Sequence, residues 1–172
     1  MSLPYNVPGM TVLLAQPNTM ACWATVYTMM KSWKDQSSYD IGAAVLAVGQ
    51  QYRDDFDNNT GLPPDQFGPF LAAAGMTHEP MENLSIDGWD QLMESVGLLW
   101  VGTLASPSPI SGLHSRIIEG MYGDGTPDGT YMKMIDPAGG VRYDEQFSVF
   151  IAKYEGAFQS SGSDQYFQIR HF

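Results

Sequence analysis

The sequence has 172 residues, of which 44% are hydrophobic and 16% charged, so it can bury one sizeable core but hardly two. We therefore predict a single domain over residues 1–172. The formal net charge of -11 argues against nucleic acid and anionic membranes as main partners. Cys22 is the only cysteine, which excludes an internal disulfide and a metal cluster built from several thiols. No cofactor and no metal site are predicted.

Membrane insertion and conventional export are also disfavoured. The sequence contains no run of about 18 apolar residues, so no membrane-spanning segment is expected. The start, Met1-Ser2-Leu3-Pro4-Tyr5, lacks the positive region and the apolar core of a signal peptide. Any export is therefore expected to use a route independent of a signal peptide.

The first 97 residues are predicted to be mostly helical. Apolar residues at helical spacing indicate a helix at about 20–33, with Asn18 or Thr19 as its N-cap. A second helix is expected at about 41–53, with Asp40 as its N-cap.

An exposed loop over residues 54–61 is expected to separate these helices from two more. Both later helices have the residues that commonly begin and end helices. Their expected boundaries are Pro63-Pro64 and Gly75 for the first, and Ser85 or Asp87 and Gly97 for the second.

The pattern changes after residue 97, where runs of apolar residues predict strands. The expected strands are Leu98–Leu104, His114–Tyr122, Gly129–Asp136 and Tyr166–His171, with an exposed loop at 106–109 and a helix at about Asp144–Tyr154. Helices followed by mostly antiparallel strands indicate an α+β fold, with a helical N-terminal half packed against a sheet half. The cleft between the halves is the natural place for a site.

Cys22 is expected in the first turn of the first helix. The free backbone N–H groups and the positive dipole end of a helix N-terminus stabilise a thiolate, which makes a nucleophile. The same N–H groups can bind an oxyanion, and Gln16, six residues upstream, could add a carboxamide donor. The alternative is that Cys22 is a small buried hydrophobic residue.

A thiolate needs a basic partner, and the sequence offers only His78, His114 and His171. His114 begins a predicted hairpin whose return strand ends at Asp136. With a five-residue loop from Gly123 to Pro127, His114 lies directly opposite Asp136. A loop of four or six residues makes the pair diagonal, which still allows contact. An imidazole and a carboxylate in contact would support a thiolate–imidazolium pair.

The hairpin turn itself has a second interpretation. Asp124, Thr126 and Asp128 place oxygen atoms at alternate positions, as calcium loops do. A calcium loop also needs a later bidentate glutamate, and Glu145 is too far along the chain. A plain hairpin turn is therefore the favoured interpretation.

The order Gln16, Cys22-Trp23, His114 and Asp136-Pro137 resembles that of papain-like cysteine proteases. It also resembles the order in bacterial effector and toxin proteases, including the avirulence-type proteases of plant pathogens, and in the leader peptidases of bacteriocin exporters. Papain has asparagine as the third member, so Asp136 indicates these bacterial branches. Arg116 and Glu119 depart from the apolar strand expected after the histidine; either this strand is partly exposed, or Arg116 and Glu119 line the cleft.

The resemblance implies a papain-like fold and a role for each motif residue. Cys22 would be the nucleophile, His114 the base, Asp136 the residue that orients His114, and Gln16 the oxyanion donor. It further implies a cysteine endopeptidase toxin or effector that cleaves proteins or peptides in a target cell. Such a protein would remain in the producer's cytoplasm until a bacterial secretion system delivers it, with competition between bacteria as one setting and a cognate immunity protein as partner.

Three alternatives to this hypothesis remain open. A papain-like fold with the same residues could form an amidase acting on peptidoglycan peptides. It could also form a deamidase or a transglutaminase. The third alternative is a non-catalytic binding module with a buried Cys22.

Overall fold

The computed structural model describes residues 3–108, 112–161 and 167–172. The helices of these residues are α1 (Cys22–Asp35), α2 (Ile41–Val48), α3 (Gln50–Asp57), α4 (Pro64–Ala74), α5 (Ile86–Val96) and α6 (Phe147–Ser161). The strands are β1 (Tyr5–Asn6), β2 (Thr77–His78), β3 (Leu99–Leu104), β4 (Leu113–Gly123), β5 (Thr130–Asp136), β6 (Val141–Gln146) and β7 (Ile169–His171). None of these helices combines the length and the apolar character that a membrane span needs.

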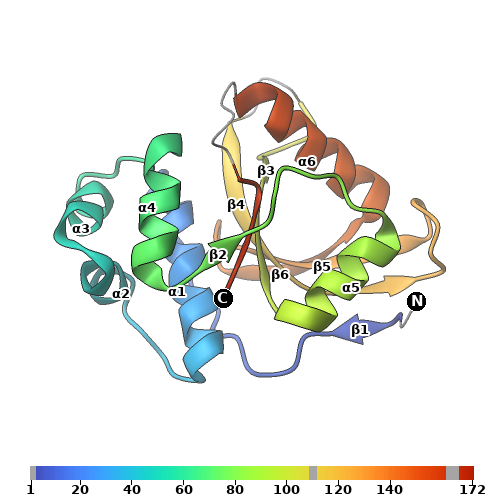
Figure 1. The fold of residues 1–172 in the computed structure, drawn as a ribbon, viewed down its shortest axis with the longest axis horizontal. Helices are drawn as coiled ribbons and strands as arrows, with labels where there is room; N and C mark the ends of the chain where they lie inside the picture. The colour runs from blue at the N-terminus through green and yellow to red at the C-terminus, as the bar shows by residue number, and fades with distance from the viewer. Residues whose placement is uncertain (1–2, 109–111, 162–166) are drawn as a thin grey trace.

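The strands form one antiparallel sheet in the order β2-β7-β3-β4-β5-β6, and β1 pairs with β4 outside that path. In Figure 1 the helices α1–α4 gather on one side of the molecule, and the sheet with α5 and α6 occupies the other. This arrangement confirms the predicted α+β class.

Helices cover both faces of the sheet. Alternation along β3 directs Trp100 toward α1–α4, while Leu99 and Val101 pack with α5 and α6. The helix α5 therefore packs on the face opposite the other N-terminal helices. Two large hydrophobic clusters result, one on each face of the sheet.

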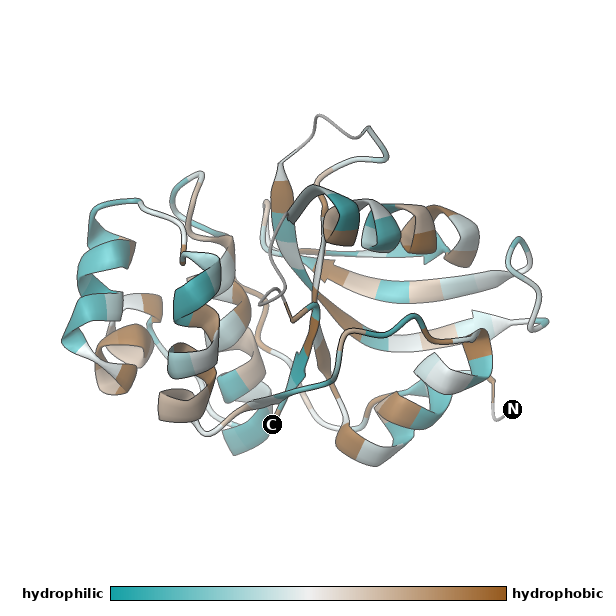
Figure 2. Cartoon of the chain, turned by 45° about the horizontal axis from the view of Figure 1, so that its top comes forward, coloured by the Kyte–Doolittle hydropathy of each residue, from teal (hydrophilic) through white to brown (hydrophobic). Residues whose placement is uncertain are grey.

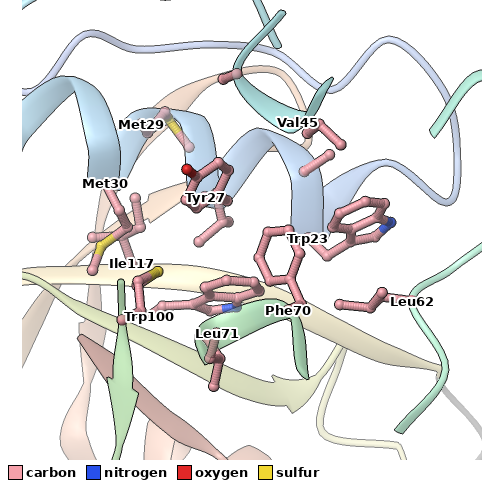
Figure 3. Close-up of a cluster of buried hydrophobic side chains, with 14 of the residues drawn as sticks. Trp23, Tyr27, Met29, Met30, Val45, Leu62, Phe70, Leu71, Trp100 and Ile117 are labelled. Atoms are coloured by element: carbon pink, nitrogen blue, oxygen red, sulfur yellow. The ribbon is translucent and has the colours of Figure 1, made fainter. Parts of the chain in front are cut away.

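The cluster beneath α1 fixes the helix that carries Cys22. Phe70 of α4 makes edge-on ring contacts with Trp23, Tyr27 and Tyr52, at centroid distances of 5.5, 5.1 and 5.0 Å. Figure 3 shows these α1 side chains directed toward Phe70 and toward Trp100 of the sheet. Because Trp23 is only 2% exposed, the first turn of α1 is held by the core directly beside the thiol.

The predicted first helix is confirmed, but its start was placed two residues too early. The N-cap residue is Ala21, and no side chain caps the helix. Asn18 and Thr19 lie outside the cap position, so the prediction that one of them caps the helix is wrong. Asn18 instead accepts a backbone hydrogen bond from Ala21, at 3.2 Å, in the turn that leads into α1.

The predicted helix at 41–53 is two helices. Asp40 caps α2 as expected, accepting from the Ala43 N–H at 2.9 Å. Gly49 then takes an extended conformation, which ends α2 and starts α3. Glycine disfavours the helix interior, and here it marks the break. Residues 54–57, predicted as loop, complete α3; Figure 2 shows α3 as mostly hydrophilic beside the hydrophobic α2.

The helices α4 and α5 follow their predicted boundaries. Gly75 closes α4 in the left-handed conformation, with φ 71°. Ser85 caps α5 by accepting from the Gly88 N–H at 3.1 Å, and Gly97 follows its last residue.

The predicted strands at 98–104, 114–122 and 129–136 agree with β3, β4 and β5 to within one residue. The register of the β4–β5 hairpin differs from the predicted one. Tyr122 pairs with Tyr131 and Gly123 with Thr130, which leaves a six-residue loop, and a bulge follows at Glu119. Within the loop, the Asp124 carboxylate accepts from Thr126 N–H and Oγ1, as in a local Asx turn.

Two boundaries near the C-terminus also differ. Residues 141–146 form the edge strand β6, so the helix expected from Asp144 begins at Phe147. The polar sequence of β6 hides its strand character, since only one of its faces is half-buried. The last strand is confirmed as β7; the predicted first residue, Tyr166, and residue 109 of the predicted exposed loop lie outside the described residues.

Candidate active site

Cys22 is the first residue of α1 and is partly exposed. Since no side chain caps the helix, the backbone N–H groups of its first turn are not taken up by a capping residue. These groups and the helix dipole favour negative charge at this point. The position agrees with the predicted placement of the thiol in the first turn.

His114 and Asp136 are in contact, although the register is not the predicted one. Ile117 pairs with Ile135, which places Arg116, not His114, opposite Asp136. His114 is the diagonal neighbour, and its Nε2 lies 2.7 Å from Asp136 Oδ1. An ionised carboxylate only accepts hydrogen bonds, so Nε2–H is the donor. The other ring nitrogen, Nδ1, is then left for a different partner.

That partner is Cys22, which links α1 to the sheet. Burial acts to raise the pKa of the Cys22 thiol, but hydrogen bonds with His114 and Ser115 and the charge of His114 outweigh it. The pKa of Cys22 is therefore below its usual value. A lowered thiol pKa increases the fraction of nucleophilic thiolate near neutral pH.

The pKa values of His114 and Asp136 shift in opposite directions. Burial acts to lower the pKa of His114, but hydrogen bonds with Asp136 and Cys22 raise it above its usual value. Burial acts to raise the pKa of Asp136, yet the His114 hydrogen bond and the charge of Arg116 bring it down to about 2. The three groups therefore favour a thiolate, an imidazolium and a carboxylate in a row.

A cleft of about 190 Å³ opens beside these residues. Cys22, His114 and Ser115 lie on its walls, with mostly apolar neighbours from the α3–α4 connection, from α4 and from the start of β4. These neighbours include Leu62, Pro64, Phe67 and Leu113. An extended peptide placed here would have its backbone beside Cys22 and side chains against an apolar wall.

A comparison with models of known protein families shows to which family the chain belongs. The family model described as papain-like cysteine protease AvrRpt2 matches residues 1–155, which is most of the sequence. The chain belongs to this family. It is a papain-like cysteine protease and hence a hydrolase, and the family implies that its substrate is a protein. No curated protein sequence matches it.

In this protease Gln16 lies on the segment that leads into α1 and is not among the residues that line the Cys22 cleft, although its neighbour Thr19 is. Its carboxamide nitrogen donates to Asn18 O at 2.8 Å and to Thr19 O at 3.2 Å. Its Oε1 is buried without a hydrogen-bond partner among the described residues. The oxyanion role of Gln16 stays a prediction, since the donor hydrogens engage loop carbonyls in this conformation.

The sequence did not assign a role to Arg116 of the protease. Its side chain is 6% exposed, and Nε donates to Asp136 Oδ2 at 2.9 Å. The strand is buried around Arg116, and Arg116 is not among the residues that line the cleft, so neither explanation offered for its departure from an apolar strand holds for it. Glu119 is partly buried, pairs with Arg142 at 2.7 Å and is not among the walls of the cleft. The sequence did contain one signal for a buried ion pair: an arginine placed within a predicted strand of mostly apolar residues is rarely buried unless it is paired.

Proposed function

We propose that the protein hydrolyses peptide bonds with Cys22 as nucleophile, His114 as general acid and base, and Asp136 as the group that orients His114. The observation that carries this proposal is the position of the His114 ring, which hydrogen-bonds Cys22 on one side and Asp136 on the other. A nucleophile that contacts a base, which a third group orients in turn, is the arrangement that enzymes use for nucleophilic catalysis.

The reaction then follows from the charges at the site. The Cys22 thiolate attacks the substrate carbonyl carbon, and the electron pair of the C=O bond moves onto oxygen. Backbone N–H groups at the start of α1 bind that oxyanion, with Gln16 as an additional donor if its carboxamide releases a loop carbonyl. The imidazolium of His114 gives its proton to the leaving amine as the C–N bond breaks, leaving a thioester on Cys22.

The second half of the reaction regenerates the enzyme. Neutral His114 takes a proton from a water molecule, which attacks the thioester carbonyl. The C–S bond breaks, the acid product leaves, and Cys22 and His114 return to the thiolate and imidazolium. Asp136 keeps its charge throughout and stabilises the imidazolium in each half.

For the cellular role we propose an effector or toxin that cleaves proteins inside a target cell. The family assignment and the bacterial character of the motif support this proposal. We further propose that a bacterial secretion system delivers the protein and that it lies in the producer's cytoplasm beforehand. In competition between bacteria, the producer would need a cognate immunity protein to block the Cys22 cleft.

The test expresses wild type, Cys22→Ala and His114→Ala in a susceptible cell and searches the proteome for new N-termini. His78→Ala is the matched control, because His78 lies on β2 and stacks on Phe167 at 3.6 Å, away from the cleft. We expect new termini only in wild type and His78→Ala. In vitro, His114→Ala should lower kcat/KM by roughly 10³-fold or more, as losing a catalytic histidine does.

Labelling of Cys22 by an epoxide inhibitor provides a second measurement. We expect stoichiometric labelling of wild type and His78→Ala, and strongly slowed labelling of His114→Ala. Toxicity that depends on Cys22 but produces no new termini would favour the amidase or another modifying enzyme. A Cys22 that reacts no faster than free cysteine, with function retained in Cys22→Ala, would show the catalytic proposal to be wrong.

A further inference from the structure

Arg116 is the buried charge closest to the proposed catalytic residues. It lies two residues from His114 on β4 and opposite Asp136 of β5 in the observed register. Only 5% of the residue is exposed. A buried arginine is retained at little cost only when its donors are hydrogen-bonded and its charge is paired.

The guanidinium of Arg116 makes four hydrogen bonds, and together they fix its plane. Nε donates to Asp136 Oδ2 at 2.9 Å. Nη1 donates to Thr103 Oγ1 at 2.7 Å and to Leu104 O at 3.0 Å, and Nη2 donates to Ala105 O at 2.9 Å. Three of the four acceptors lie at the end of β3, where Thr103 pairs with His114. The guanidinium thus bridges the end of β3 to the carboxylate on β5.

The two oxygens of Asp136 have different partners. Oδ1 accepts from His114 Nε2 at 2.7 Å and from the Ala138 N–H at 2.8 Å. Oδ2 accepts from Arg116. Besides His114, one donor holds each oxygen: the Ala138 N–H holds Oδ1, and the Arg116 guanidinium holds Oδ2. Together these two donors determine the rotation of the carboxylate about its Cβ–Cγ bond, so the Arg116 contact supplies the side-chain part of the restraint that orients Oδ1.

We propose that Arg116 is a positioning residue of this protease, which holds the Asp136 carboxylate in the orientation that lets Oδ1 accept the His114 Nε2–H. The inference rests on the proposed function for its effect on catalysis. Arginine suits the task because its planar fork holds several acceptors at once, whereas the ammonium group of lysine acts as a point charge.

Charge balance in this part of the core supports a paired role. The ionisable groups around Arg116 and Asp136 come from four elements: His114 on β4, Tyr143 and Glu145 on β6, Lys153 on α6, and Cys22 on α1 through His114. Lys153 pairs with Glu145, so Arg116 and Asp136 form the second pair of the cluster. His114 is then free to carry a charge that the Cys22 thiolate balances.

The test compares Arg116→Gln and Arg116→Lys with wild type. Arg142→Gln is the matched control, because Arg142 pairs with Glu119 at 2.7 Å in the same sheet, yet its side chain is 48% exposed. The direct readout is the downfield NMR signal of the proton between His114 Nε2 and Asp136. We expect that signal to weaken or shift in both Arg116 variants and to stay unchanged in Arg142→Gln.

Catalysis provides the second readout. Misplacing a catalytic group by about 1 Å can cost about 10²-fold in rate, so we expect kcat to fall by about that factor in Arg116→Gln. The kcat of Arg116→Lys should fall less, because lysine keeps the positive charge and loses only the planar guanidinium group. KM should change little in either variant, because Arg116 does not lie among the residues that line the cleft. If Arg116→Gln fails to fold, Arg116→Lys alone decides.

The outcomes separate this inference from the proposed function. A folded Arg116→Gln or Arg116→Lys with wild-type kcat and an unchanged proton signal would overturn the positioning role, whatever Cys22 does. A proton signal that depends on Arg116 in a protein without any Cys22-dependent peptidase activity would keep the positioning role and overturn the proposed function. Equal losses in the Arg142→Gln control would also contradict a specific role for Arg116.

Discussion

His114 is a residue on which opposite physical effects act at once. Burial disfavours its charged form, while the Asp136 carboxylate and the Cys22 sulfur favour it. The effect of these two partners is the larger one, so the pKa of His114 is raised. The same contacts explain why the pKa of Cys22 is lowered although burial alone would raise it. The reactive state of the site is therefore a property of the three side chains together, as expected for coupled titrations.

Asp136→Asn tests this coupling. With its amide oxygen in the place of Oδ1, asparagine can still accept from His114 Nε2–H, while its NH2 group faces Arg116 Nε and cannot accept from it. The change therefore removes the charge and the Arg116 hydrogen bond but keeps the His114 contact. The pKa of His114 is raised in the wild type, which means that the imidazolium persists to higher pH. Without the carboxylate charge that pKa falls, and the basic limb of the kcat/KM profile should move to lower pH. The rise of Cys22 alkylation with pH should move to higher pH, because a weaker imidazolium supports the thiolate less.

The control for this prediction is Asp128→Asn in the exposed turn of the same hairpin. It should leave both pH profiles where they are in the wild type. Profiles that stay in place in Asp136→Asn as well would mean that the Asp136 charge does not support the pair.

Residue chemistry explains which parts of the site could be predicted from the sequence. Cysteine, histidine and aspartate each have a reactive group, so Cys22, His114 and Asp136 could be singled out by type and order. Arg116 could not be assigned because most of its acceptors are a hydroxyl and two backbone carbonyls at the end of β3. Backbone acceptors leave no trace in the sequence.

At the scale of elements, the hairpin shows how a correct contact arises from a wrong register. The prediction required a five-residue loop, whereas the hairpin has a longer loop and a bulge at Glu119. Each changes the register, and neither can be read from residue types. His114 and Asp136 meet diagonally because the imidazole ring of His114 is long enough to reach the neighbouring position. The edge strand β6 was missed for a related reason, since its polar residues lack a clear alternating pattern.

The turn between β5 and β6, which follows Asp136, packs against the segment that carries Gln16. Pro137 O accepts from the Gln16 N–H at 2.7 Å. Gly140, with φ 63°, packs against the same segment: a Cβ there would lie 2.8 Å from Leu14 C and 2.9 Å from Ala15 N. Backbone atoms at that distance cannot move aside as a flexible side chain can.

We therefore expect Gly140→Ala to push the 14–16 segment away from the turn. Gly139→Ala is the matched control: it also has a positive φ, 90°, but its added Cβ would meet only Val141 Cγ1, at 3.7 Å. Relative to this control, Gly140→Ala should lower the free energy of unfolding by about 1–3 kcal/mol, the usual cost of overpacking. It should also lower kcat, if Gln16 serves the oxyanion. Urea unfolding and peptide kinetics measure both, and equal unfolding free energies for the two variants would contradict the proposed close packing.

At the scale of the whole molecule, the sheet separates two hydrophobic clusters and places the proposed catalytic groups on different elements. Cys22 comes from a helix packed on one face, while His114 and Asp136 come from the strands. The sequence predicted helices, strands and their antiparallel character, because these follow from local spacing. It did not predict that α5 would pack on the face opposite α1–α4, since both choices bury an apolar helix face equally well.

The net charge of -11 is a property of the whole molecule and affects how charged substrates approach it. A molecule of this charge attracts cationic peptides over roughly one Debye length, about 10 Å at 0.1 M salt and about 3 Å at 1 M. For a lysine-rich peptide we expect kcat/KM to fall by about tenfold or more between these salt concentrations, with the loss mainly in KM. An uncharged peptide with the same residues around the cleaved bond should change far less, since the chemical step at Cys22 is the same. Parallel salt dependence for the two peptides, or a preference for an acidic peptide at low salt, would show that the acidic surface does not take part in substrate capture.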